Sequence, residues 1–159
     1  MSIESPIRIS LEQDGEYSFR VHFPDTGLEP LLTDESPPLG NDAGPNPARL
    51  LLASVANCLA ASLLFALRKF KNSPEPIRAE ICAVPARNEQ GRWRIGSAKA
   101  TLHLPGRNAD YKGLERALAQ FEDFCVVTQS VRQGIEVEVT VVDGEGRVLL
   151  GDKHHEAGA

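Results

Sequence analysis

Hydrophobic and polar positions alternate near the start of the chain, in the pattern of a half-buried β-strand. In residues 17–23, YSFRVHF, aromatic and aliphatic side chains occupy every second position. The segment before it, residues 6–16, contains the dipeptide Asp14-Gly15, which favours a tight hairpin turn. We therefore expect an N-terminal antiparallel sheet that folds as a hairpin around this turn.

The alternation stops at residues 24–47, which are dense in Pro, Gly, Asp and Asn. Such a composition predicts a long ordered loop or a linker, and loops of this length are often functional. The segment ends in Asn46-Pro47, a residue pair that suits the cap and the first position of a helix. We expect a helix from there to about Phe70, and it would contain the longest uncharged run in the chain, LLLASVANCLAASLLFAL at residues 50–67.

Alternating patterns return in the second half of the chain. Residues 77–87 and 91–106 are expected to form a hairpin that turns at residues 88–91. One face of the second strand carries Ala98, Ala100, Leu102 and Leu104, whereas Lys99, Thr101 and His103 lie on the other. The two strands would therefore have one apolar side and one polar side.

The remaining elements are expected to be two helices and a last strand. Asn108 is placed to cap a helix with apolar residues at helical spacing, namely Tyr111, Leu114, Ala117, Leu118 and Phe121. A short helix is expected to end at Gly134, followed by a strand at residues 135–143. The order is strands, long helix, strands, helix and strand, which we interpret as one domain at residues 1–150 with a polar tail at residues 151–159.

Composition narrows the possible functions. The chain has 159 residues, of which 42% are hydrophobic and 25% charged, as in an ordinary globular domain. Its net charge of −5 disfavours binding to nucleic acid. The N-terminus, MSIESPIRIS, lacks the basic and apolar regions of a secretory signal. Three cysteines in such a chain indicate a reducing compartment, so we expect a cytoplasmic protein.

The apolar run has two structural interpretations. Its length, about eighteen residues, is the lower limit for a membrane-spanning helix. Five alanines, two serines, Asn57 and Cys58 make it weakly hydrophobic for that length, however. A helix buried within the protein fits the rest of the chain better, because the other elements have the patterns of a soluble domain. We therefore expect no membrane partner.

Among the chemistries that side chains could supply, only thiol chemistry has suitable residues. The four histidines are isolated or lie in the tail and no Cys-x-x-Cys occurs, so a metal site is not expected. Ser54 and Ser62 lie within a helix and not on a Gly-x-Ser-x-Gly turn, which argues against acyl transfer. The three cysteines are Cys58, Cys82 and Cys125.

Cys58 lies near the middle of the expected long helix. At about 100° per residue it shares a face with Leu51, Ser54, Val55, Ala61, Ser62 and Phe65. The small residues Ser54, Ala61 and Ser62 would leave a shallow depression, rimmed by larger apolar side chains, in which an apolar substrate could bind. The alternative is that Cys58 is simply a small buried hydrophobic residue, as free cysteines often are.

The thiolate form of Cys58 would need a positive charge from elsewhere in the fold. Cys58 is too far from the helix N-terminus for the helix dipole to act on it, and burial raises the pKa of a thiol. Arg49 falls on the opposite face of the helix, so Arg20, on the polar side of an N-terminal strand, is our candidate partner. Cys125 lies at the expected start of a helix, where free N–H groups favour a thiolate. Cys82 is interpreted as an incidental thiol.

Several of these motifs together resemble the OsmC/Ohr family, the osmotically inducible and organic hydroperoxide resistance proteins. The similar segments are LLTDESPPLG, AGPNPARLLLASVANCLAASL and FEDFCVVTQSV, and the resemblance extends over about residues 7–143. The most specific part is the Gly44-Pro45-Asn46-Pro47 helix entry with a cysteine eleven residues after Pro47. The resemblance implies an α+β fold in which antiparallel sheets pack around a long central helix that bears the cysteine. It also implies an intertwined homodimer with its active sites between the subunits.

The resemblance further implies a stress-response function, that of an antioxidant thiol peroxidase. Cys58 would be the peroxidatic residue that reduces an organic hydroperoxide to an alcohol and becomes a sulfenic acid. Cys125 would be the resolving residue that forms a disulfide with it, and a dithiol or lipoyl-type reductant would restore both thiols. No metal, haem or flavin cofactor is implied. The residues expected at the substrate are Ser54, Val55, Ala61, Ser62 and Phe65.

One departure from the family pattern keeps a second function open. Peroxidase members carry a glutamate directly after the helix-opening proline, where it pairs with an active-site arginine, and this chain has Ala48. A non-catalytic dimeric protein of the same fold, which binds an apolar ligand, is therefore the alternative to the peroxidase.

Overall fold

The computed structural model describes residues 5–134, 141–142 and 148–150. An N-terminal sheet contains β1 (Ser10–Gln13), β2 (Phe19–His22) and β3 (Leu31–Thr33), all antiparallel and in that order. The first two strands form the hairpin expected from Asp14-Gly15. The third strand lies within the segment expected to be a loop or linker. The sequence did not predict this strand, because three residues are too few to show an alternating period.

The rest of that segment is an ordered loop organised by Asp34. This carboxylate is buried and accepts hydrogen bonds from the backbone N–H groups of Glu35 (2.9 Å), Asn41 (2.9 Å) and Ala43 (3.1 Å). These bonds lower the pKa of Asp34, and the bonds from Asn41 and Ala43 have the largest effect. Gly40 is required here, because a Cβ atom would collide with the backbone of Glu35 and with the Asp34 carboxylate. The expectation of an ordered loop is confirmed.

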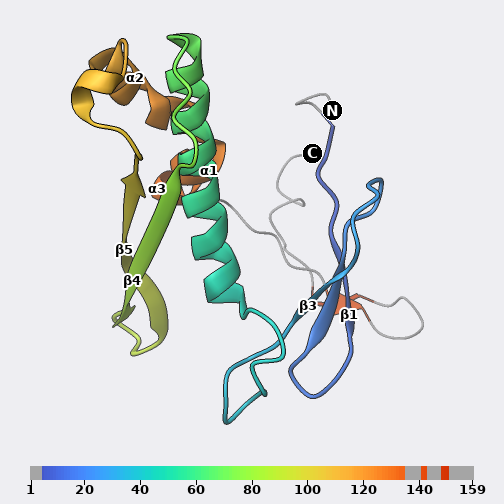
Figure 1. Ribbon diagram of the computed structural model, residues 1–159. Helices are drawn as coiled ribbons and strands as arrows, with labels where there is room; N and C mark the ends of the chain where they lie inside the picture. Colours follow the sequence, from blue (N-terminus) through green and yellow to red (C-terminus); the bar gives the residue numbers. More distant parts are fainter. Residues whose placement is uncertain (1–4, 135–140, 143–147, 151–159) are drawn as a thin grey trace, which may run out of the picture.

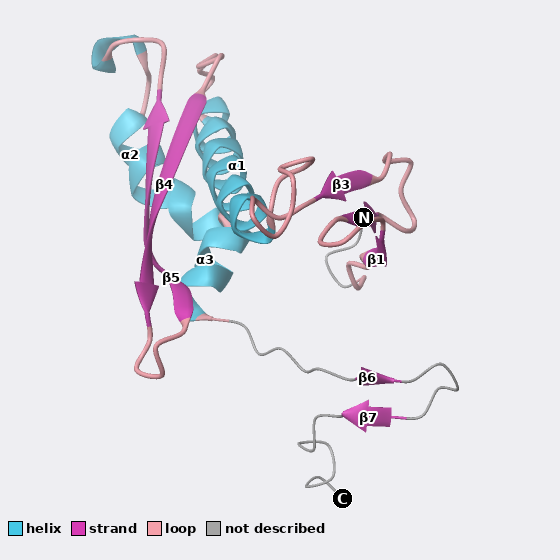
Figure 2. Ribbon diagram, turned by 90° about the horizontal axis from the view of Figure 1, so that it is seen from below, coloured by secondary structure: helices cyan, strands magenta, loops and turns pink. Residues whose placement is uncertain are grey.

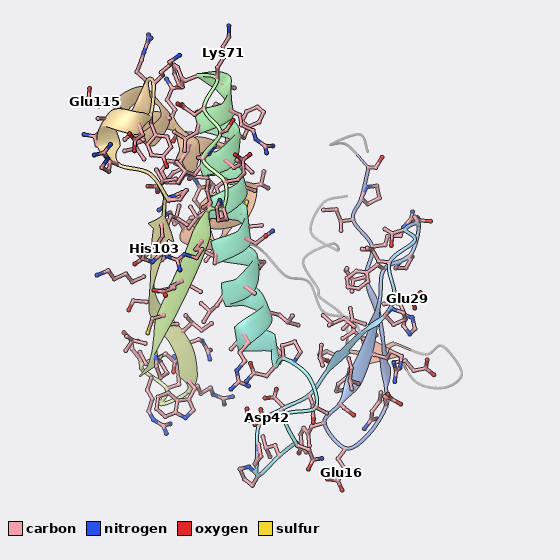
Figure 3. All side chains as sticks on the ribbon, viewed as in Figure 1. Glu16, Glu29, Asp42, Lys71, His103 and Glu115 are labelled. Carbon is pink, nitrogen blue, oxygen red and sulfur yellow. The ribbon has the colours of Figure 1, made fainter. Side chains whose placement is uncertain are left out.

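The same loop is bonded to the first turn of helix α1 (Pro47–Lys69). The Arg49 guanidinium donates to Asp42 at 3.1 Å and to Ser36 at 3.1 Å, and Ser36 donates to Asp42 at 2.6 Å. Asn46 caps the helix by accepting from the backbone N–H of Arg49 at 2.9 Å. Asp42 and Lys71 mark the two ends of the helix in Figure 3. The expected helix bounds are confirmed at both ends.

Helix α1 packs one side against a long hairpin, β4 (Arg78–Arg87) and β5 (Trp93–His103), and against several short helices (Figures 1 and 2). The first core cluster contains Leu63, Ala66, Leu67 and Ala117. The second contains Val55, Leu59 and Cys125. The N-terminal sheet lies apart from α1 and the long hairpin in both views.

The opposite side of α1 is exposed within one chain. Phe65 is 54% exposed, and Ser54, Asn57 and Ala61 lie on the same side. The helix is long and apolar enough to cross a membrane by length and composition alone. Its packed side contributes residues to both core clusters. Burial on most sides, expected from the sequence, is not present in a single chain.

The short helices differ in one respect from the expectation. A 3₁₀ helix η1 (Asn108–Asp110) replaces the first turn of the helix expected from Asn108, and α2 covers only Leu114–Gln120. Gly113 separates them because it has a left-handed backbone with φ of 62°. A second 3₁₀ helix η2 (Phe121–Phe124) leads into α3 (Val126–Gln133).

The C-terminal part of the chain is described only in fragments. Helix α3 ends before Gly134, as expected. Of the strand expected at residues 135–143, only β6 (Val141–Val142) is described, and it pairs with β7 (Val148–Leu150). The rest of that strand and the polar tail at residues 151–159 lie outside the described residues.

We predict that Asp34→Asn lowers the melting temperature by about 5 °C, because it removes the charge that three backbone N–H groups stabilise. The pKa of Asp34 is lower in the folded chain, so this stabilisation is present above the ordinary carboxyl pKa and is lost as the pH falls through the folded value. Calorimetry between neutral and acid pH should therefore show the difference shrinking in acid. Asp123→Asn, at an exposed position, is the control. Equal melting temperatures at neutral pH would refute the role of Asp34.

Candidate active site

The structure brings Cys58 and Cys125 together from two distant parts of the sequence. Cys58 lies in the middle of α1, and Cys125 is the residue that directly precedes α3. Both are free thiols and belong to one cluster with Val55 and Leu59. Cys125 is fully buried, whereas Cys58 is half-buried. The pair therefore consists of one partly exposed and one fully buried cysteine.

The helical position of Cys58 explains its partial exposure. Val55, Leu59 and Ser62 lie on the packed side of α1, and Ser54, Ala61 and Phe65 lie on the exposed side. At about 100° per residue, Cys58 falls on the border between these two sides. This position accounts for the partial exposure of the residue, which still packs against the second core cluster.

Cys125 is held by bonds at the start of α3. Its thiol donates to Thr128 Oγ1 at 2.9 Å, its backbone N–H donates to the Glu122 carbonyl at 3.0 Å, and its own carbonyl accepts from Gln129 at 3.0 Å. Burial acts to raise the pKa of Cys125. Interactions with the neighbouring Cys58 thiol, with Thr128 and with Ser62 outweigh burial, so the pKa of Cys125 is lowered.

The pKa of Cys58 is shifted in the opposite direction. Burial raises the pKa of Cys58, and the nearby Cys125 thiol raises it further. The backbone N–H groups of Val127 and Thr128 oppose these effects only in part. Of the two thiols, Cys125 is therefore the one that the structure favours as the first thiolate.

The proposed cationic partner Arg20 lies elsewhere in this chain. It belongs to β2, and its guanidinium bonds to Asp14 at 2.5 Å. The N-terminal sheet lies apart from α1 in Figure 1. In the described part of the chain, no arginine or lysine is among the groups that shift the pKa of either thiol. The assignment of Arg20 stays a prediction.

The residues expected at the substrate divide between the two sides of α1. Val55 and Ser62 are buried beside the thiol pair, and Ser62 interacts with Cys125. Ser54, Ala61 and Phe65 are exposed, and the Ser54 hydroxyl donates to the Leu51 carbonyl at 2.7 Å. The Lys69 ammonium covers the Phe65 ring at 4.8 Å from its centre. The expected set therefore does not form one surface within a single chain.

A cavity of about 510 Å³ lies between α1, the β4–β5 hairpin and α3. Neither cysteine of the pair lines it, but Val55, Leu59 and Thr128, which surround Cys125, do. Its volume is within the usual range for a ligand site. The lining is apolar apart from three residues, and it includes Leu51, Leu52, Val55, Leu59, Leu63, Ile81, Ile95, Ala98, Ala100, Leu102, Leu104, Leu118, Phe121 and Val131. The three polar residues are Glu122, Thr128 and Arg132. Of the residues expected at the substrate, only Val55 lines it.

The sequence contained a signal for part of this cavity. The alternating apolar positions of residues 98–104 were expected to share one face of their strand, and all four of them line the cavity. Glu122 and Arg132 were missed because a charged residue near a helix end usually faces solvent. Thr128 and Arg132 are four residues apart, so they share a helix face, and this spacing was the available signal.

The other candidate residues lie outside this region. Cys82 is exposed on β4, opposite Lys99 of β5. His103 lies 3.4 Å from Glu80 on the polar side of the same hairpin. Among the described residues, no three histidine, cysteine or acidic side chains converge as metal ligands would. Neither Cys82 nor His103 therefore adds a group to the thiol pair.

Comparison with known proteins identifies the family. The profile of the family described as OsmC-like protein matches residues 40–140. The chain belongs to the OsmC-like protein family. A search of curated proteins finds no significant match.

Solved structures share the fold of this OsmC-like protein at low sequence identity. An organic hydroperoxide resistance protein OsmC from Legionella pneumophila is 19% identical, with a TM-score of 0.62 over 86% of this chain and 96% of that chain. The organic hydroperoxide resistance protein OhrB of Bacillus subtilis is 15% identical, with a TM-score of 0.60 over 84% and 95%. An OsmC-like protein from Mycoplasma pneumoniae is 13% identical, with a TM-score of 0.65 over 84% and 91%. The fold is thus the α+β OsmC-like fold, with helices and small antiparallel sheets.

We predict that Thr128→Val raises the pKa of Cys125, because it removes a hydroxyl that stabilises the thiolate. The change keeps the shape of the side chain. Thiolate absorbance in the ultraviolet, followed against pH in a Cys82→Ser background, should show the first thiol ionising at higher pH. Ser130→Ala, which removes a hydroxyl bonded only to the Val126 carbonyl among the described residues, should leave the curve unchanged. An unshifted curve for Thr128→Val would contradict the assignment.

Proposed function

We propose that this OsmC-like protein is a two-cysteine thiol peroxidase that reduces organic hydroperoxides to alcohols. The observation that supports the proposal is the meeting of Cys58 and Cys125 in one cluster beside an apolar cavity. Two of the similar solved structures are described as organic hydroperoxide resistance proteins, which supports the substrate class. An apolar lining also suits an organic hydroperoxide better than hydrogen peroxide.

In the first step the Cys58 thiolate attacks the outer oxygen of the hydroperoxide. The O–O bond breaks, the substrate leaves as an alkoxide that takes up a proton to become an alcohol, and Cys58 becomes a sulfenic acid. The sulfur is oxidised by two electrons and the peroxide is reduced by two. Cys58 is assigned this step because it is the partly exposed residue of the pair, whereas Cys125 is buried.

In the second step the Cys125 thiolate attacks the sulfur of the Cys58 sulfenic acid. The new S–S bond displaces hydroxide, which leaves as water. A dithiol reductant, of the lipoyl type or a related class, then reduces this disulfide and restores both thiols. No metal, haem or flavin takes part in these steps, and a cytoplasmic location would supply the reducing conditions.

The pKa values of Cys58 and Cys125 shift in opposite directions, which suits their different roles in the two steps. A lowered pKa for Cys125 keeps a nucleophile ready for the second step. A raised pKa for Cys58 would slow the first step, but the two thiols interact directly and a proton can pass between them. The charge would then reside on Cys58 for part of the time, in reach of the substrate.

We predict that Cys58→Ser lowers the turnover of cumene hydroperoxide with a dihydrolipoyl reductant on the order of a thousandfold or more, because the attacking sulfur is gone. Cys125→Ser should reduce one equivalent of peroxide and then stop. Dimedone labelling with mass spectrometry should find the trapped sulfenic acid on Cys58.

Cys82→Ser is the matched control, since this exposed thiol lies opposite Lys99 on the β4–β5 hairpin, and the variant should turn over like the parent. Full activity of Cys58→Ser would eliminate the peroxidase. A dimedone adduct on Cys125 in the Cys58→Ser variant, with turnover retained, would reverse the two roles.

We also propose that the protein works as a homodimer. The exposed side of α1 carries Phe65, and the N-terminal sheet exposes Leu11 and Phe19. Two such apolar surfaces in one chain are more than a soluble monomer usually exposes. A second chain would cover them and could bring its own Arg20 toward the thiol pair.

Light scattering is expected to give a mass of two chains for the parent. Phe65→Glu should shift the protein toward one chain, because a charge on the exposed side of α1 opposes its burial. Circular dichroism of the variant serves as the folding control. A parent protein that remains a single chain at high concentration would refute the dimer.

The alternative function is a non-catalytic binding protein with the same fold. Ala48 favours it, because a glutamate at this position is the feature that peroxidase members use to orient their arginine. The cavity also fits a purely binding role. Retention of an apolar compound through purification, together with no peroxide turnover, would support this alternative.

A further inference from the structure

A second cavity lies at the C-terminal end of α1, away from the thiol pair. Its volume is about 420 Å³, within the usual range for a small-molecule site. Lys69, the last residue of α1, follows Cys58 by eleven residues, which corresponds to about 17 Å along the helix axis. Most of the lining is polar, and it comes from the turn after α1 and from the segment between β5 and α2. The residues are Lys71, Asn72, Ser73, Pro105, Gly106, Asp110, Tyr111 and Lys112.

The two walls of this cavity are joined by the side chain of Asn72. Its carbonyl oxygen accepts from the backbone N–H of Lys112 at 2.8 Å, and its amide nitrogen donates to the Lys112 carbonyl at 2.8 Å. The same amide nitrogen donates to the Leu67 carbonyl at 3.0 Å, in the last turn of α1. These bonds fix the backbone of Lys112 against the end of α1. The cavity therefore has both lysines held at its lining by the fold.

The wall formed by residues 105–112 has a fixed shape of its own. The Tyr111 hydroxyl accepts from the backbone N–H of Gly106 at 2.7 Å. A Cβ atom at Gly106 would lie 2.7 Å from this hydroxyl, so a larger residue there would disturb the contact. The accepting hydroxyl keeps its own proton, which it can donate to a ligand. A cavity whose shape is fixed before binding loses less entropy when a ligand enters.

Two lysines give the cavity an excess of positive charge. Lys71 and Lys112 are exposed and, among the described residues, neither has an ion-pair partner. The acidic residue in the described lining is Asp110, whose carboxylate accepts from the backbone N–H of Arg107 at 2.7 Å and lies 3.6 Å from the Arg107 guanidinium. Arg107 thus balances Asp110, and the charge of the two lysines is left over. This excess is local, because the whole chain has a net charge of −5.

We propose that this second cavity binds the phosphate group of a small phosphorylated molecule. Lys71 and Lys112 balance the two negative charges of the phosphate, and the hydroxyls of Ser73 and Tyr111 donate to its oxygens. A phosphate group alone fills only part of about 420 Å³, so the remainder holds a small organic group against Pro105 and the Tyr111 ring. The site is separate from the thiol pair, and the proposal stands whether or not the protein reduces peroxides.

The test compares phenyl phosphate with phenyl sulfate at pH 8, because the two have nearly the same shape but carry two charges and one charge. Binding is followed by NMR titration of the backbone amides. The parent is expected to bind phenyl phosphate about fivefold more tightly, with the shifted amides in residues 71–73 and 105–112. Lys71→Gln and Lys112→Gln should each weaken phenyl phosphate binding about fivefold, because each removes one exposed charge. Lys99→Gln, at an exposed position on β5, is the control and should match the parent.

Equal binding of the two compounds by the parent would overturn the proposal, and this comparison needs no variant to fold. Phenyl phosphate binding that is unchanged in both lysine variants would also overturn it, with circular dichroism as the check that they are folded. The same holds if phenyl phosphate does not bind, or if the shifted amides lie elsewhere. Neither compound contains a peroxide bond, so these results are independent of the peroxidase.

Discussion

The packing of Cys125 against the middle of α1 is the contact on which the rest of the site depends. Cys125 has no exposed surface, and its neighbours Val55 and Leu59 come from one side of the helix. This contact fixes the start of α3 and places the second thiol beside the first. A change that moved α3 away from α1 would separate the thiols and open the cavity at once.

The other end of α1 is fixed by a different kind of interaction. The loop before the helix has no apolar core of its own, and the Asp34 carboxylate organises it by accepting three backbone hydrogen bonds. Arg49 and Asp42 then join the loop to the first helical turn. Polar bonds thus set where the helix begins, and apolar packing sets what lies against its middle.

Much of the secondary structure could be predicted from the sequence, because the signals are local. The Asn46-Pro47 helix start, the hairpin at Asp14-Gly15 and the alternating residues 98–104 all follow from neighbouring side chains. Strand β3 is too short to show a period, and the left-handed Gly113 breaks a helix whose apolar spacing continues across it. These two errors come from backbone geometry that the hydrophobic pattern does not encode.

The site was predicted less completely than the fold. Both thiols could be identified as candidates from the sequence, and the family resemblance implied their roles as the peroxidatic and the resolving residue. The residues that share a helical face with Cys58 follow from the helix period. Which of them are buried depends on contacts with other elements. The sequence therefore grouped the exposed Ser54, Ala61 and Phe65 with the buried Val55 and Ser62. The Glu122–Arg132 pair depends on how η2 meets α3, a tertiary contact without a local signal.

The hydrogen bond between Cys125 and Thr128 has a consequence for the oxidised protein. A disulfide sulfur has no proton to donate and is a weak acceptor, whereas the Thr128 side chain is buried in the reduced form, at 6% exposure. Oxidation would leave this hydroxyl without its partner in a place that water scarcely reaches, which penalises the oxidised form. Such a penalty makes the disulfide more oxidising and hence easier to reduce. The fold around Thr128 would therefore favour the reduced thiol pair over the proposed disulfide.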